Sequence, residues 1–242
     1  LQELGLLHLD TKTCTGRRFG ESFAHPILSD GELQWSTEPS ENSDEGVLAR
    51  AASPFHAEGG IQLLTGNIGR SVIKVSAVSN ENKCVRAEAI VLSDPSELKK
   101  LYDAEQLNKD AVIVVPNQGP KANGMPELHQ LMPILLNIQS AGHKVALITD
   151  GRMSGASGSV PAAIHMVPEA ADDGIIGLIQ TGDMITLNAL DGSLNIEVDS
   201  AAFKTREYEH SITCRESVGR QLFRNDRKIV SNAEKGASTI FD

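Results

Sequence analysis

Short apolar runs recur along the chain between residues 61 and 198 and predict several β-strands. Residues 71–78 alternate between apolar and polar side chains, which is typical of a strand with one buried face. Residues 111–115 and 145–148 are continuously apolar, and short runs of this kind indicate strands that are buried on both faces. Further strand candidates are residues 61–64, 86–92, 175–178, 184–187 and 194–198.

Two helices are predicted between these strands. The first begins at a capping residue followed by Pro95 and should run to about Leu107. The second begins near Glu127 and carries apolar side chains three or four positions apart on one face. Each of the two continuously apolar strands is therefore followed directly by a loop, and these two loops come one after the other along the chain.

The whole pattern predicts a mixed α/β, β-rich architecture, either barrel-like or a swivelling β/β/α domain. Residues 1–46 are mostly irregular and polar, and we interpret them as a connector. Residues 47–200 hold the predicted strands and form the β-rich domain. Residues 201–242 form a polar tail that should be partly helical over residues 217–232.

Composition narrows the class of partner. The chain has 242 residues, 40% of them hydrophobic, which is enough for one sizeable core. Its formal net charge of −10 argues against binding to nucleic acid or to an anionic membrane surface. The chain has neither an apolar run of the roughly 20 residues that a membrane span needs nor the pattern of a signal peptide. We therefore expect a soluble, cytoplasmic protein that binds a small molecule.

The segment 149–159 directly follows one of the apolar strands and is the strongest chemical candidate. Its glycines allow the backbone to approach a ligand closely, and its hydroxyls and amides can face an anion. The residues concerned are Gly151, Gly155, Gly158, Ser154, Ser157 and Ser159. The spacing is not that of a dinucleotide fingerprint, a P-loop or a nucleophile elbow. From the residues alone, an anion-binding loop and a plain surface turn are equally acceptable.

Two further segments carry acidic and imidazole groups. Glu127 stands at the predicted start of a helix, where a carboxylate commonly interacts with the helix dipole but can also bind Mg²⁺. His165 lies beside an apolar run, where a histidine is more often a core residue than a ligand. Arg152 and Lys121 are either orienting groups for an anion or ordinary structural side chains.

Taken in order, these segments resemble the dihydroxy-acid dehydratase and 6-phosphogluconate dehydratase family. The resemblance rests on residues 116–127, 146–158 and 165–170 and on their spacing. Residues 67–71 and 152–165 are similar to the 6-phosphogluconate members, because the branched-chain members carry Gly-Asn-Leu-Ala-Pro and an Arg-Gly after the serine motif. The resemblance implies a hydro-lyase that converts 6-phospho-D-gluconate to 2-dehydro-3-deoxy-6-phosphogluconate in the Entner–Doudoroff pathway.

The resemblance also implies roles for individual residues. Ser154, as an alkoxide, would be the catalytic base, and Glu127 would be a ligand of Mg²⁺. Ser157, Arg152 and Lys121 would contact the substrate. The substrate would be a phosphorylated sugar acid, which agrees with the small-molecule partner that the composition indicates.

Members of this family also bind an iron–sulfur cluster through cysteines of a longer N-terminal domain, which supplies the other Mg²⁺ ligands. Cys14, Cys84 and Cys214 do not match those positions, and we interpret them as free thiols. Residues 1–46 would then lead from a missing cluster-binding domain into a C-terminal domain that is inactive alone, and the complete enzyme would be a homodimer. The alternatives are a related sugar-acid or dihydroxy-acid dehydratase and a non-catalytic anion-binding module.

Overall fold

The computed structural model describes residues 1–2, 4–36, 44–154, 158–203, 205–207 and 218–240. The chain divides into two compact units, Leu1–Glu58 and Gly59–Asp242, and each is described by itself. No helix in these described ranges combines the length and the apolar character that crossing a membrane requires.

The first unit contains a two-stranded antiparallel hairpin that the hydrophobic pattern did not predict. It is preceded by the short helix η1 (Phe19–Phe23) and consists of β1 (His25–Ser29) and β2 (Glu32–Ser36). Asp30 and Gly31 join the strands with positive φ angles of 54° and 83°. Two consecutive left-handed residues form the tight turn that a right-twisted hairpin favours. The Asp-Gly pair was therefore the signal for this element.

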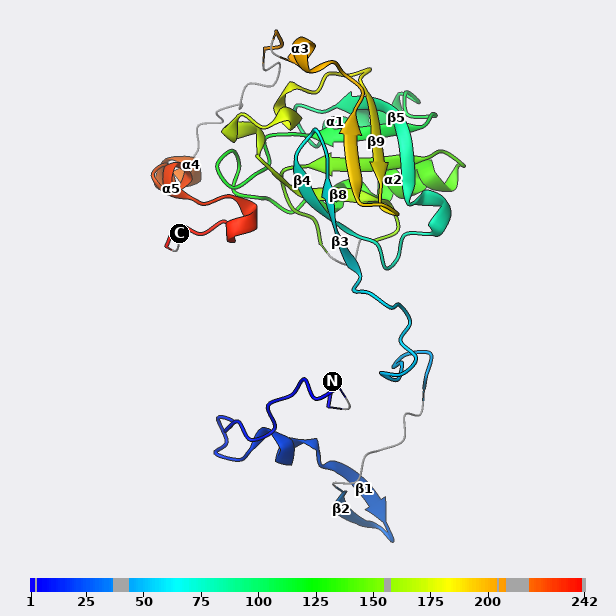
Figure 1. The fold of residues 1–242 in the computed structure, drawn as a ribbon, viewed down its shortest axis with the longest axis vertical. Helices are drawn as coiled ribbons and strands as arrows, with labels where there is room; N and C mark the ends of the chain where they lie inside the picture. The colour runs from blue at the N-terminus through cyan, green and yellow to red at the C-terminus, as the bar shows by residue number, and fades with distance from the viewer. Residues whose placement is uncertain (3, 37–43, 155–157, 204, 208–217, 241–242) are drawn as a thin grey trace. The chain divides into compact units, whose positions relative to one another are not determined.

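The second unit contains a closed barrel (Figure 1). Its eight strands have the order β10-β3-β4-β8-β7-β6-β5-β9. Strands β5 to β8 pair in parallel, β10 meets β3 in parallel, and the other neighbours are antiparallel. The bounds are β3 Ile61–Thr65, β4 Arg70–Lys74, β5 Cys84–Val91, β6 Ala111–Val115, β7 Val145–Thr149, β8 Ala162–Val167, β9 Met184–Asn188 and β10 Ser193–Ile196. The predicted β-rich, barrel-like architecture is confirmed.

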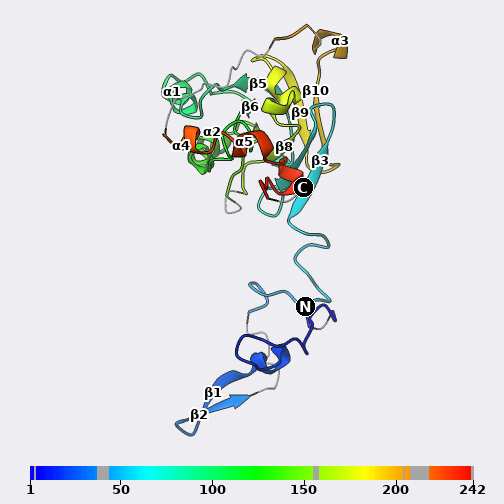
Figure 2. The same cartoon turned by 90° about the vertical axis from the view of Figure 1, so that its left-hand side faces the viewer.

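Strands β6 and β7 are buried on both faces, as their continuous apolar runs predicted. Successive side chains of a strand point to opposite faces, so Val114 belongs to the core inside the barrel and Ile113 to a second core outside it. Side chains of α1 (Glu97–Asp103) and α2 (Met132–Ser140) complete the outer core. Both helices lie on the same side of the barrel (Figure 2).

Two predicted helix boundaries and two predicted strands differ from the structure. The strand predicted at 71–78 is β4, which already ends at Lys74. Helix α1 ends at Asp103, before the expected Leu107, and α2 begins at Met132 rather than near Glu127. Glu127 instead forms an isolated bridge with Arg152, and this pairing holds its backbone out of a helix. The predicted strand at 175–178 is the 3-10 helix η5. The prediction was wrong because a short, buried apolar run has no periodicity that distinguishes a strand from a helix.

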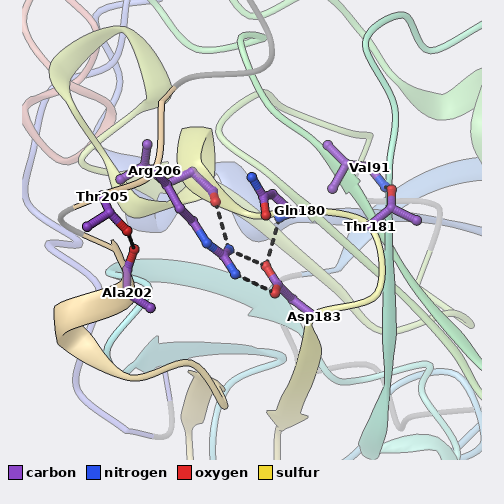
Figure 3. Close-up of polar contacts among 8 residues, drawn as sticks. Val91, Gln180, Thr181, Asp183, Ala202, Thr205 and Arg206 are labelled. Atoms are coloured by element: carbon purple, nitrogen blue, oxygen red, sulfur yellow. Dashed lines mark hydrogen bonds and ion pairs between the residues drawn. The ribbon is translucent and has the colours of Figure 1, made fainter.

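The remaining elements are short. They are η2 Asn80–Asn82, η3 His129–Leu131, η4 Ala170–Asp172, α3 Ser200–Phe203, α4 Val218–Leu222, α5 Asp226–Ile229 and η6 Ala233–Lys235. Beyond α3, the side chain of Arg206 binds Asp183, the residue that directly precedes β9 (Figure 3). Its guanidinium donates to the two carboxylate oxygens of Asp183 at 2.6 and 2.8 Å and to the carbonyl oxygen of Leu178 at 3.0 Å.

Candidate functional site at the loops after strands β6 and β7

The two loops that carry the predicted motifs leave the barrel side by side. Strands β6 and β7 pair in parallel register up to Val115 and Thr149, so both loops start at the same end of the sheet. Ligand sites in parallel sheets commonly lie at this carboxyl end. Further along, the bridge between Glu127 and Arg152 joins the loops, and the N–H of Leu128 donates to the carbonyl oxygen of Arg152 at 3.2 Å.

This bridge brings together three of the predicted site residues, Glu127, Arg152 and Ser154. The backbone N–H groups of Ser154 and His129 donate to Oε1 of Glu127 at 2.8 and 3.1 Å. Nη1 of Arg152 donates to Oε2 at 3.1 Å, and its Nε donates to the carbonyl oxygen of Met125 at 2.7 Å. The Glu127 carboxylate therefore fixes the backbone position of Ser154 directly.

Ser154 lines a small cavity of about 40 Å³. Lys74 at the end of β4 lines the same cavity, so a second cationic side chain besides Arg152 lies near this serine. The sequence interpretation did not assign a role to Lys74, whose only signal was its place at the end of the segment 67–74 that resembles the family. Ser157, a predicted substrate contact, lies outside the described residues.

Asp150, in the loop after β7, connects this loop to the loop after β6 and to the start of η4. Its carboxylate is completely buried and accepts the N–H groups of Asn117, Gln118 and Ala170 at 3.1, 2.7 and 3.0 Å. Burial raises the pKa of Asp150, and these backbone hydrogen bonds only partly oppose that rise. Asp150 is a positioning residue that the sequence interpretation did not single out, although it directly follows a buried strand.

Glu169 anchors the loop after β6 in a similar way. It is 2% exposed and accepts the N–H groups of Lys121 and Ala122 at 3.0 and 3.2 Å. Burial raises its pKa, and the nearby charges of Asp150 and Asp172 act in the same direction. The ammonium group of Lys121 pairs with Asp172 rather than with Glu127 or Ser154. The structure therefore does not bring Lys121 into the group formed by Glu127, Arg152 and Ser154.

His165 is half-buried in β8, and its backbone N–H donates to the carbonyl oxygen of Gly151 at 2.9 Å. A Cβ atom added to Gly151 would lie 2.6 Å from Cβ of Gln118, so glycine is needed where the two loops approach each other. Burial lowers the pKa of His165, and the charge of Arg152 lowers it further. Both effects disfavour a positive charge on the imidazole.

The described residues supply one candidate metal ligand. Within the ranges that the structure describes, no three His, Cys, Asp or Glu side chains lie close enough to hold a metal ion. Glu127 accepts three N–H groups, and a carboxylate has about four acceptor sites, so one position remains for a cation that shares the group with Arg152. Cys14 and Cys84 are free thiols, and Cys214 lies outside the described part of the chain.

Comparison with known proteins identifies the family. The family described as Dihydroxy-acid/6-phosphogluconate dehydratase C-terminal matches residues 46–237. The phosphogluconate dehydratases of Pseudomonas aeruginosa and Escherichia coli are 44% and 43% identical over 98% and 99% of this chain. A dihydroxy-acid dehydratase of Nautilia profundicola is 30% identical over 88% of the chain.

The chain spans 38–40% of the length of these curated relatives. The matches confirm the resemblance that the three ordered motifs indicated. The chain therefore belongs to the dihydroxy-acid/6-phosphogluconate dehydratase family, and it corresponds to the C-terminal part of its members.

Proposed function

We propose that this chain forms the serine-bearing wall of a hydro-lyase site that dehydrates 6-phospho-D-gluconate to 2-dehydro-3-deoxy-6-phosphogluconate. The observation that carries the proposal is the 2.8 Å hydrogen bond from the N–H of Ser154 to Glu127, which joins two of the predicted motifs in one loop pair. The two phosphogluconate dehydratases with identities of 44% and 43% support this substrate over a dihydroxy acid.

In the proposed reaction, the Ser154 alkoxide takes the proton from C2 of the substrate as the C3 hydroxyl leaves as hydroxide. The leaving hydroxide then receives that proton from Oγ of Ser154 and is released as water, which regenerates the alkoxide. The resulting enol then tautomerises to the 2-keto acid. A serine hydroxyl is a weak base at neutral pH, so its anion must be stabilised by nearby positive charge. Lys74 lines the same cavity as Ser154, so its positive charge supports an alkoxide at this position.

We further propose that Glu127 contributes one oxygen to a Mg²⁺ ion and that Arg152, Ser157 and Lys121 contact the substrate. Lys121 would have to leave its ion pair with Asp172 to do so. A bound Mg²⁺ ion and an iron–sulfur cluster supply Lewis acids that polarise substrate oxygens. Their other ligands, the homodimeric assembly and the cytoplasmic location are proposals that rest on family membership.

The replacement Ser154→Ala in the full-length protein tests this function. Loss of the base should lower kcat for 6-phosphogluconate by at least about 100-fold, because positioned acid–base groups contribute about that much. The backbone N–H that binds Glu127 is retained in alanine, so metal content and thermal stability should not change. Ser96→Ala is the control, because Ser96 carries an exposed hydroxyl outside the two motif loops. Activity of Ser154→Ala comparable to that of the control would refute the assignment.

A further inference from the structure

A second, larger pocket lies between the loop after β6 and the C-terminal helices α4 and α5. Its volume is about 490 Å³, which lies in the usual range of about 300–1,000 Å³ for small-molecule sites. Gly124 belongs to the loop wall, and Arg220 and Arg227 belong to the opposite wall. No role has been assigned to this pocket by the proposed reaction.

The pocket combines two fixed cationic groups. Arg220 donates from Nη1 to Oδ1 of Asn123 and from Nη2 to the carbonyl oxygen of Ala122, both at 3.1 Å. Arg227 donates from Nη1 to the carbonyl oxygen of Arg220 at 2.9 Å. Among the described residues that line the pocket, Asp226 is the one acidic side chain, so these residues supply two positive charges and one negative charge. Planar guanidinium groups that are already oriented are well suited to bind a phosphate.

The wall that faces these arginines is held by hydrogen bonds and belongs to the loop that continues to Glu127. The N–H of Gly124 donates to the carbonyl oxygen of Gly119 at 2.9 Å, and the buried Glu169 carboxylate holds the backbone between them. Gly124 and Glu127 are three residues apart, so their Cα atoms are separated by at most about 11 Å. An extended six-carbon sugar acid with a terminal phosphate can span such a distance.

We propose that this pocket holds the phosphate group of a phosphorylated sugar acid whose carboxylate end lies at Glu127 and Ser154. The proposal rests on the proposed function and deepens it, because it assigns Arg220 and Arg227 as the residues that select a phosphorylated substrate. The 119–124 loop would then separate the reacting carbons from the phosphate and set the distance between them.

The replacement Arg227→Gln in the full-length protein tests this assignment. It should raise KM for 6-phosphogluconate by about tenfold or more, with kcat changed less than about twofold, because a charged hydrogen bond is lost far from the reacting carbons. Arg224→Gln is the matched control, since Arg224 is exposed in the same segment and does not line the pocket. A fall in kcat without a rise in KM, or equal effects of the two replacements, would overturn the proposal.

A second pair of variants leaves both arginines in place. Thr239 is an exposed residue of the pocket lining, so Thr239→Glu adds a negative charge and Thr239→Gln adds a neutral group of the same size. Only Thr239→Glu should raise KM for 6-phosphogluconate and weaken the binding of inorganic phosphate, measured by calorimetry, by about tenfold. Equal behaviour of the two variants would contradict a phosphate site.

The calorimetric measurement also separates this proposal from the proposed function. If the wild-type protein does not dehydrate 6-phosphogluconate, the proposed function fails, whatever the pocket binds. The pocket assignment then stands if 6-phosphogluconate and inorganic phosphate bind the wild-type protein more tightly than the Arg227→Gln and Thr239→Glu variants, and it falls if they do not.

Discussion

Asp150 has no exposed surface and accepts N–H groups from the loop after β6 and from the start of η4. The pKa of Asp150 is raised above its ordinary value of 3.8, so the folded chain binds this proton more tightly than the unfolded chain does. Glu169 behaves in the same way, because burial also raises its pKa. Their contribution to the free energy of unfolding is therefore full below about pH 4 and falls as the pH rises through their folded pKa values.

The replacement Asp150→Asn should flatten part of this pH dependence. Wild-type free energies of unfolding, measured in urea between pH 4 and pH 8, should fall more steeply with pH than those of the variant. An asparagine amide also presents N–H groups where the loops need an acceptor, so the variant should lose about 1–3 kcal/mol at pH 5. Parallel pH curves for the two proteins would show that Asp150 does not titrate as inferred.

The sequence suggested some of the candidate site residues and not others for physical reasons. Glu127 and Ser154 were suggested because their motifs resemble those of a known family in order and spacing, and their roles stay predictions. Lys74 was missed because its position beside Ser154 depends on the pairing of β4 with β8, which no local pattern encodes. Arg227, which we propose as a phosphate contact, was not suggested because the polar C-terminal segment gives no sign of which barrel loop it packs against.

At the scale of elements, the barrel closes at a weak seam. Strands β10 and β3 share a single pair, Ser193 with Thr65. The side chain of Asn67 continues the contact, since its Nδ2 donates to the carbonyl oxygen of Ile196 and its Oδ1 accepts the N–H of Ile196, both at 2.8 Å. Gly66 allows this approach, because an added Cβ atom would lie 1.8 Å from the carbonyl oxygen of Leu194.

The replacement Gly66→Ala should therefore force the seam apart. We expect it to lower the free energy of unfolding by about 1–3 kcal/mol, because backbone must move to accept the methyl group. Gly59→Ala is the control, since an added Cβ atom there meets nothing within 4 Å, and it should change stability by less than about 0.5 kcal/mol. Urea unfolding monitored by circular dichroism measures both effects, and equal midpoints would contradict the steric argument.

The elements that the sequence predicted best are those whose burial is uniform. Strands β6 and β7 were predicted within one residue because both of their faces are apolar. Strand β8 was not predicted, although it is needed to close the barrel, because its residues were interpreted only as part of a motif. The late start of α2 could not be predicted, because it depends on the pairing of Glu127 with a residue of another loop.

At the scale of the whole molecule, the ion pair of Arg206 with Asp183 fixes the segment after α3 on the barrel. The two side chains are only 15% and 10% exposed. Burial alone would raise the pKa of Asp183, but hydrogen bonds from Arg206 and from the N–H of Gln180 outweigh it, and the pKa is lowered. The stabilisation from this pair is present above about pH 4 and is lost as the pH falls through the lowered folded pKa, which is opposite in sign to the effect of Asp150.

The replacement Asp183→Asn should cost about 1.5–3 kcal/mol at pH 7, since it removes a charged partner from a poorly exposed guanidinium. The cost should begin to shrink below about pH 4, where the carboxyl of the unfolded chain is protonated, and should disappear as the pH falls through the lowered folded pKa. Glu197→Gln is the control, because its ion pair with Arg86 has side chains that are 46% and 58% exposed, and it should have a much smaller effect. The assignment is wrong if urea unfolding gives the same loss for both variants at pH 7.

The seam between β3 and β10 also has a consequence for synthesis. Asn67 precedes its partner Ile196 by 129 positions. At about 5–20 residues per second, the ribosome needs roughly 6–25 seconds to make that stretch. During this time β3 and β4 have emerged but the barrel cannot close, so the apolar side chains that later face its interior remain without their partners. We therefore expect the nascent chain to expose the most apolar surface to water during this interval.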